Sequence, residues 1–271
     1  MPSAGEEPIN ELEKPDISGF RDHVGHQLSA TTANHDLKIV RMMLEDAKRD
    51  GYIPDNPADG VSTLKKTQNN KKRRAFTMDE LKRVMKVASG EWYGLIMFGL
   101  YTGQRLKDLV MLTWQNLDLE DRVIILETSK TGRVQRIPIA SPLLDFIATI
   151  EAGESSAARL FPQSYSTYKR RLVNSTATLS NQFYDLMVEA GIVKERSHKA
   201  TGKGRHAPRA VSEISFHALR HTATSLLKKA GVSAAVVQDI IGHESSAISN
   251  QYTHIDDEAK AMALSKLPDL G

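Results

Sequence analysis

SFHALRHTATSLLKKAG, residues 215–231, predicts a helix that has two different faces. Its apolar residues recur at helical spacing and form one stripe: Leu219, Ala223, Leu226, Leu227 and Ala230. Gly231 is the expected end of this helix, because glycine adopts the left-handed conformation that closes many helices. A helix with a single apolar stripe packs on a core, so the stretch indicates a helical domain.

The other face of the same helix carries His217, Arg220, His221 and Thr224 at i, i+3, i+4 and i+7. This face offers hydrogen-bond donors to an anion, or it is simply a solvated polar face. A third interpretation is zinc, because His217 and His221 have the i, i+4 spacing of a metal-binding pair. Arg220 argues against zinc, since a cation stands where a metalloprotease has its glutamate, and no further ligand follows at useful spacing.

A second candidate is TGQRLKD, residues 102–108, in which Arg105 follows the Gly103 turn at a predicted helix start. Unpaired backbone N–H groups at such a position favour an anion and would act together with the guanidinium. Asp108, three residues later, is placed to orient Arg105. Taken alone, Arg105 is equally consistent with an ordinary ion pair.

Two strands are predicted at 123–127 and 134–139, on either side of SKTGR, residues 129–133. Two strands joined by a short glycine-containing loop form a β-hairpin, with Lys130 at its tip. Farther along the chain, His243 follows the predicted helix stop at Gly242, and Tyr252 lies within SNQYTHID, residues 249–256. Each of these three polar residues, taken alone, is typical of a protein surface.

The remaining pattern is mainly helical. Thr77 and Glu80 form a capping box, with Phe76 and Leu81 spaced as a hydrophobic staple. WYGLIMFGLYTG, residues 92–103, predicts a deeply buried helix. Other helices are expected near 105–113, 142–151, 166–175, 179–190, 234–241 and 246–253. The predicted fold class is therefore mainly α with a small antiparallel β-sheet (α+β).

The N-terminal part differs in character. Residues 1–30 lack a clear period and are expected to be irregular, whereas a helix is predicted from Thr31 to about Gly51. The segment 64–74, LKKTQNNKKRR, has no apolar period and is typical of a linker. The expected organisation is a small helical region over 1–63, this linker, and a larger domain over 75–271.

Composition limits the class of protein. The chain has 271 residues, of which 40% are hydrophobic and 25% charged, as in globular proteins. It contains no apolar run near the roughly 18 residues of a membrane span, and its N-terminus is acidic and polar, so we expect a cytoplasmic protein. Zero cysteines exclude disulfides, thiolate metal sites and a cysteine nucleophile.

The net charge is only +3, but basic residues are concentrated in two segments. The linker holds six Lys or Arg without an acid, and KERSHKATGKGRHAPR, residues 194–209, holds six Lys or Arg with one Glu. Such segments are either solvated surface or a phosphate-binding face. The candidate DNA-binding residues are Lys65, Lys66, Lys71, Lys72, Arg73, Arg74, Lys203 and Arg205.

The order of the motifs is more specific than any one of them. TGQRLKD, the hairpin loop, FHALRHTAT and IIGHESSAISNQYTHID follow one another as in the tyrosine recombinase (phage integrase) family, which this sequence resembles over about residues 75–256. A weaker resemblance to the DNA-embracing N-terminal domain of that family covers 31–66. The resemblance implies a tyrosine-recombinase catalytic domain and a site-specific DNA recombinase or integrase.

The resemblance also implies roles for the candidate residues. The expected catalytic set is Arg105, Lys130, His217, Arg220, His243 and Tyr252. In this set the two arginines and two histidines hold a phosphate, the lysine is the general acid, and the tyrosine is the nucleophile that forms a 3′-phosphotyrosyl bond. Asp108 and His221 support these groups. No cofactor, metal ion or ATP is expected.

The expected partners are double-stranded DNA, three further copies of the chain in a tetramer on DNA, and accessory DNA-bending proteins, at the nucleoid. The tail after Tyr252 docks either on its own domain or on a neighbouring subunit. Compared with the family the N-terminal region is shortened, which leaves recognition of the target site open. A topoisomerase with the same chemistry, and a non-catalytic regulator based on a helix-turn-helix over 226–252, remain alternatives.

Overall fold

The computed structural model describes residues 8–65, 73–129, 132–170, 175–195, 212–242 and 257–268. The chain divides into two compact units, one comprising 1–71 with 197–211 and the other 72–196 with 212–271. The division lies inside the basic segment for which a linker was predicted.

The first unit is a helical hairpin. After a short 3-10 helix at Ile9–Glu11, helix α1 (Lys14–Gln27) packs against α2 (Ala30–Arg49). The prediction that residues 1–30 are irregular was wrong. Helix α1 has two internal glycines and buries only Ile17, so its period is weak, but a capping box and contact with α2 stabilise it.

The second unit contains the other elements. In chain order these are α3 (Met78–Val87), α4 (Glu91–Thr102), α5 (Leu106–Val110), a 3-10 helix (Trp114–Asn116), β1 (Leu117–Asp118), β2 (Val123–Glu127), β3 (Val134–Pro138), α6 (Ser141–Thr149), α7 (Pro162–Lys169), α8 (Ala177–Glu189), α9 (His217–Lys229), α10 (Ala234–Ile241) and α11 (Asp257–Leu264). The predicted fold class is confirmed.

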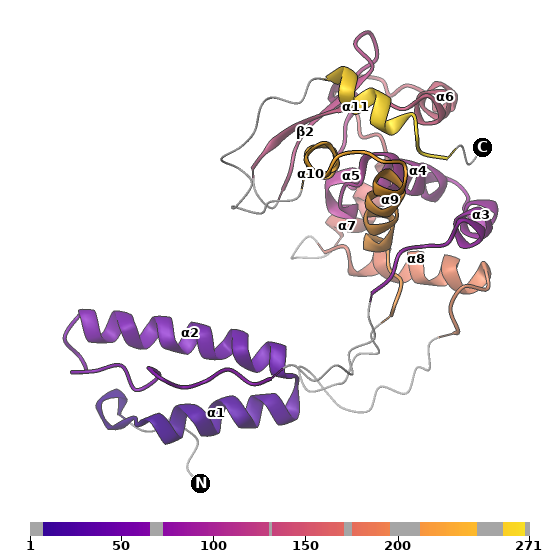
Figure 1. Cartoon of the computed structure of the whole chain (residues 1–271). Coiled ribbons are helices and arrows are strands. Elements are labelled where there is room, and N and C mark those ends of the chain that lie inside the picture. The colour runs from indigo at the N-terminus through magenta and orange to yellow at the C-terminus, as the bar shows by residue number, and fades with distance from the viewer. Residues whose placement is uncertain are drawn as a thin grey trace. The chain divides into compact units, whose positions relative to one another are not determined.

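Helix α4 is the centre of this unit, and α9 lies beside it (Figure 1). Every residue of α4 from Gly94 to Thr102 is buried, as its apolar sequence predicted. The close contact depends on Gly99, because a Cβ there would lie 2.9 Å from both Leu219 and Phe216 of the α9 region. The apolar stripe of α9 therefore packs on α4.

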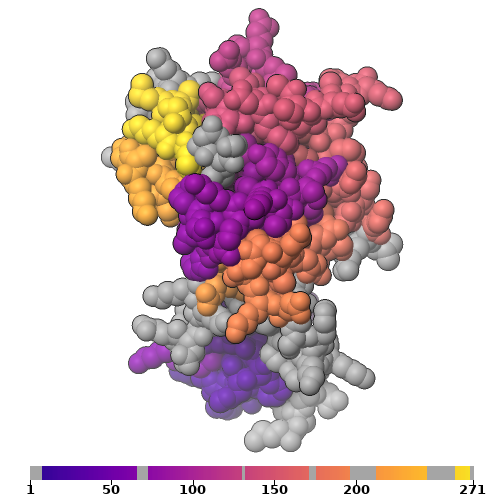
Figure 2. Space-filling model, turned by 90° about the vertical axis from the view of Figure 1, so that its right-hand side faces the viewer, coloured from indigo at the N-terminus to yellow at the C-terminus, as the bar shows by residue number. Residues whose placement is uncertain are grey.

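The sheet has three antiparallel strands in the order β1-β2-β3. The predicted hairpin is confirmed, with Val123 opposite Pro138 and Glu127 opposite Val134. Strand β1 was missed because its two residues are too few to show alternation. Helix α11 packs on β3 of the same chain, and Figure 2 shows it beside α10.

The predicted capping box is confirmed, since Thr77 and Glu80 cap the start of α3. The helix expected over 166–175 is α7, which begins four residues earlier because Pro162 opens it in the position that proline favours. The helix predicted over 246–253 lies outside the described residues. Within the described ranges, no helix has the length and apolar character needed to cross a membrane.

Candidate active site

Arg220 is the most deeply buried charged residue of those described, at 1% exposure. Its Nη1 donates to the carbonyl of Gly103 at 2.7 Å and its Nη2 to the carbonyl of Gly242 at 3.0 Å. These carbonyls stand at the C-terminal ends of α4 and α10, where helix dipoles favour a cation. Arg220 therefore joins three helices and is held in one orientation.

Both carbonyls belong to glycines in the left-handed region, with φ of 64° at Gly103 and 73° at Gly242. Neither position has room for a side chain. A Cβ would lie 2.3 Å from Cδ1 of Ile241 in the first case and 2.3 Å from Nε2 of Gln135 in the second. The two glycines that ended the predicted helices thus also supply the acceptors that fix Arg220.

Arg105 immediately precedes α5, and its side chain is 30% exposed. Its Nη1 lies 3.8 Å from Oδ2 of Asp108, which is an ion-pair distance and too long for a hydrogen bond. That carboxylate is buried, and its Oδ2 has no hydrogen-bond partner among the described residues. Its Oδ1 accepts a 3.0 Å hydrogen bond from the backbone N–H of Ser129 in the hairpin loop. Asp108 therefore faces Arg105 while it holds the loop.

The two guanidinium groups influence each other. Burial, and after it the charge of Arg105, lower the pKa of Arg220 to about 10, although Asp108 acts in the opposite direction. A pKa near 10 still leaves Arg220 protonated at neutral pH. The described part of the site thus holds more positive than negative charge, and a bound anion would offset that excess.

His217, the first residue of α9, faces the same positive charge. Its pKa is lowered to about 4, mainly by burial and in addition by the charges of His221, Arg220, Arg105 and Arg73. The ring of His217 stands perpendicular to that of His221, with centroids 5.0 Å apart. At neutral pH His217 is therefore an uncharged imidazole that can donate one hydrogen bond and accept another.

The structure thus brings together six of the predicted residues: Arg73, Arg105, Asp108, His217, Arg220 and His221. Three predicted catalytic residues, Lys130, His243 and Tyr252, lie outside the described residues. Two of these three have a chain neighbour bonded to the site, because Ser129 donates to Asp108 and the Gly242 carbonyl accepts from Arg220.

The predicted DNA-binding residues are only partly described. Lys65, in the first unit, and Arg73, in the second, are exposed. Outside the described ranges lie Lys66, Lys71, Lys72, Lys203 and Arg205.

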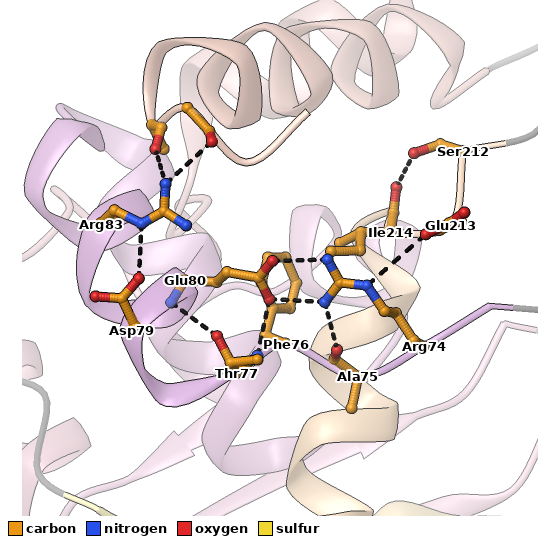
Figure 3. Close-up of polar contacts among 12 residues, drawn as sticks. Arg74, Ala75, Phe76, Thr77, Asp79, Glu80, Arg83, Ser212, Glu213 and Ile214 are labelled. Atoms are coloured by element: carbon orange, nitrogen blue, oxygen red, sulfur yellow. Dashed lines mark hydrogen bonds and ion pairs between the residues drawn. The ribbon is translucent and has the colours of Figure 1, made fainter. Parts of the chain in front are cut away.

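Arg74 is engaged within the protein (Figure 3). Its guanidinium donates to both carboxylate oxygens of Glu80, at 2.7 and 2.6 Å, and its backbone N–H donates to the carbonyl of Glu213 at 3.1 Å. The hydrogen bond from Arg74 lowers the pKa of Glu80 to about 2. The backbone N–H of Phe76 then donates to Thr222 of α9. This network, which the sequence did not reveal, fixes the segment that carries Arg73 next to α9.

His217 and His221 have the i, i+4 spacing of a zinc-binding pair. Among the described residues, no group of three or more His, Cys, Asp or Glu side chains is placed to hold a metal ion. Three of the four charged groups that act on His217 are arginines, which are donors only.

Residues 74–259 match the model of the phage integrase family. The chain belongs to the phage integrase family. Its relatives include the integrase of Salmonella phage P22, 24% identical over 83% of this chain and 54% of that protein. The tyrosine recombinase XerC-like protein of Caldanaerobacter subterraneus subsp. tengcongensis is 24% identical over 86% of this chain and 64% of its own length. The chain thus spans between about half and two thirds of the length of these relatives.

Solved structures of integrases share the fold. The Tn1549 transposon integrase in complex with transposon right end DNA gives a TM-score of 0.65 at 22% identity, over 94% of this chain and 85% of that one. A lambda integrase tetramer bound to a Holliday junction gives a TM-score of 0.63 at 21% identity, over 91% of this chain and 68% of that one.

Proposed function

We propose that this chain is a tyrosine-type site-specific DNA recombinase, which cuts and rejoins DNA strands through a 3′-phosphotyrosyl intermediate. The observation that carries the proposal is the convergence of Arg105, His217 and Arg220 on one positively charged site, where Asp108 is the one carboxylate of the described residues that influences Arg220. A phosphodiester fits this site because it is anionic and gains further negative charge during the reaction.

The arginines bind and activate the phosphate. Arg220 is fixed by two carbonyls, whereas Arg105 is partly exposed and only loosely paired with Asp108. Preorganised donors of this kind stabilise the pentavalent transition state without further rearrangement. The two guanidinium groups supply the positive charge that metal ions supply in many phosphoryl-transfer enzymes, so we propose a reaction that needs neither a metal ion nor ATP.

The remaining steps move one proton off the nucleophile and one onto the leaving group. The Tyr252 hydroxyl attacks phosphorus, the bond to the 5′-oxygen breaks, and Lys130 protonates that oxygen. His217, uncharged at neutral pH, and His243 either hydrogen-bond to the phosphate or accept the tyrosine proton. A 5′-hydroxyl of the partner strand then attacks the phosphotyrosine, and the energy of the original diester is conserved.

We propose double-stranded DNA as the partner and a homotetramer as the assembly that exchanges strands. The lambda integrase relative is a tetramer on a Holliday junction, and the Tn1549 integrase is held on transposon DNA. In this proposal residues 1–63 form a shortened DNA-binding region, 64–74 a basic linker and 75–271 the catalytic domain. The linker contacts phosphates at the nucleoid, and accessory DNA-bending proteins assist assembly.

A helix-turn-helix regulator would need an exposed recognition helix. Helix α10 instead buries Val237, Ile240 and Ile241, and it contacts β3 and α11. The regulator also leaves the group around Arg105 and His217 without a role. These observations favour the recombinase.

The test is covalent capture on DNA. Nicked duplexes tiled from the DNA that flanks the gene are incubated with the full chain, so that cleavage releases a short strand and traps the protein. We expect a covalent band from the wild-type chain and complete loss of it in Tyr252→Phe. Binding without any covalent product on every duplex would favour the regulator, and relaxation of plasmids without a specific site would indicate a topoisomerase.

A further inference from the structure

The loop between β2 and β3 is short and closed at its base. The backbone N–H of Thr128 donates to the carbonyl of Arg133 at 2.9 Å, and the N–H of Gly132 donates to the carbonyl of Thr128 at 2.9 Å. These bonds define the ends of the loop but do not fix it relative to the helices around it. That requires contacts from outside the hairpin.

Two carboxylates supply these contacts, one at each end. Asp108 accepts the N–H of Ser129 at the first end. At the second end, Nη2 of Arg133 donates to Oδ1 of Asp239 in α10 at 2.6 Å. The Asp239 side chain is 16% exposed, so water screens this pair less than a fully exposed one.

Asp239 is itself held in place. Its Oδ2 lies 3.4 Å from Nζ of Lys260, a buried lysine of α11 that also donates to the carbonyl of Arg136 in β3. The backbone carbonyl of Asp239 accepts from Nε2 of Gln135 at 3.1 Å. Contacts from two further elements thus fix the carboxylate that receives Arg133.

We propose that Asp239 is a positioning residue. Through its bond to Arg133, it holds the loop to which Lys130 belongs. The inference rests on the proposed function, in which Lys130 protonates the departing 5′-oxygen. Asp239 does not contact DNA in this scheme. It acts because a general acid must lie within hydrogen-bond reach of its oxygen, and a loop held at only one end rarely does.

The test separates proton donation from all other steps. Cleavage by the full chain is measured on two nicked duplexes, one ordinary and one with sulfur in place of the bridging 5′-oxygen at the cut. A thiolate leaves without protonation because a thiol is far more acidic than an alcohol. We expect Asp239→Asn to cleave the ordinary duplex about 10- to 100-fold more slowly than wild type. On the sulfur duplex we expect both proteins to cleave at the same rate.

Two further variants are compared with Asp239→Asn, one in the same ion pair and one as a control. Arg133 is a partly exposed loop residue, and Arg133→Gln should cleave the ordinary duplex as slowly as Asp239→Asn and the sulfur duplex at the wild-type rate. The double variant should be no slower than either single variant. Asp121→Asn is the matched control, because Asp121 pairs with Arg136 at 2.9 Å on the same sheet without contacting the loop. It should cleave both duplexes at the wild-type rate.

Equal slowing of Asp239→Asn on both duplexes would overturn the inference, since the defect would then not lie in proton transfer. If Asp239→Asn does not fold, as judged by its melting curve, Arg133→Gln decides by the same criterion. Failure of the wild-type chain to cleave either duplex is a different result, because it removes the proposed function and this inference with it.

Discussion

Two arginine–carboxylate pairs in the second unit differ in geometry. Arg74 and Glu80 are bonded through both guanidinium arms at 2.6 and 2.7 Å, whereas Arg105 and Asp108 stand 3.8 Å apart. The first pair is complete within the protein and stabilises the segment before α3. The second leaves a partly exposed guanidinium beside a buried carboxylate, so its charge remains available to a ligand. The geometry of the pair, not its presence, separates a structural arginine from a candidate catalytic one.

The largest expected effect comes from the pair of Arg105 and Asp108, called here the open pair because no hydrogen bond joins its side chains. Arg105→Gln removes one preorganised cation, and we expect the rate of covalent capture to fall by about 10²- to 10³-fold. We also expect its melting temperature to fall, because the buried Asp108 carboxylate loses the nearest charge that offsets its own. Single-turnover cleavage and a thermal melt measure the two quantities. A large loss of stability with unchanged cleavage would make Arg105 a structural arginine and not a catalytic one.

The closed pair, Arg74 and Glu80, should affect stability more than cleavage. Glu80→Gln leaves Arg74 without its carboxylate, and we expect unfolding free energy to fall by about 1–2 kcal/mol, less than for a fully buried pair because Arg74 is 40% exposed. Single-turnover cleavage at saturating DNA should remain near that of wild type. Denaturant titration measures the first quantity, and a cleavage loss as large as that of Arg105→Gln would contradict the assignment.

The lowered pKa of Glu80 predicts that the folded state loses stability as the pH falls. The pKa of Glu80 is lowered from 4.5 to about 2, so the unfolded chain binds a proton at higher pH than the folded one. The stability that this carboxylate contributes is complete above about 4.5 and is lost as the pH falls toward 2. Glu80→Gln should therefore lose less stability than wild type over that interval.

Much of the candidate site was predictable because it depends on local spacing. Helical periodicity places His217, Arg220 and His221 on one face, and glycine turns mark the positions before Arg105 and after α10. Spacing does not reveal tertiary partners. The sequence predicted Arg220 as a donor on a polar face, but the fold buries it between the ends of two other helices.

The contacts that were missed join residues far apart in the chain. Arg133 and Asp239 are separated by 106 positions, and Asp239 lies in none of the motifs. Helix α1 was missed for a related reason, since its stability comes from α2 more than from its own apolar period. Local patterns thus identify which residues face a site, whereas packing decides which of them remain available for chemistry.

The smallest expected effect is a shift in the pKa of His217. It tests whether the charge of Arg105 acts at the same site as His217. By NMR, His217 should titrate near pH 4, chiefly because it is buried and then because positive charge surrounds it. Arg105→Gln should raise that pKa by removing one of these charges, and bound DNA should raise it more, since a phosphate favours the protonated ring. Asp121→Asn is the control, because Asp121 pairs with Arg136 of β3, and it should leave the titration unchanged. If Arg105→Gln also leaves it unchanged, Arg105 and His217 do not act on a common anion.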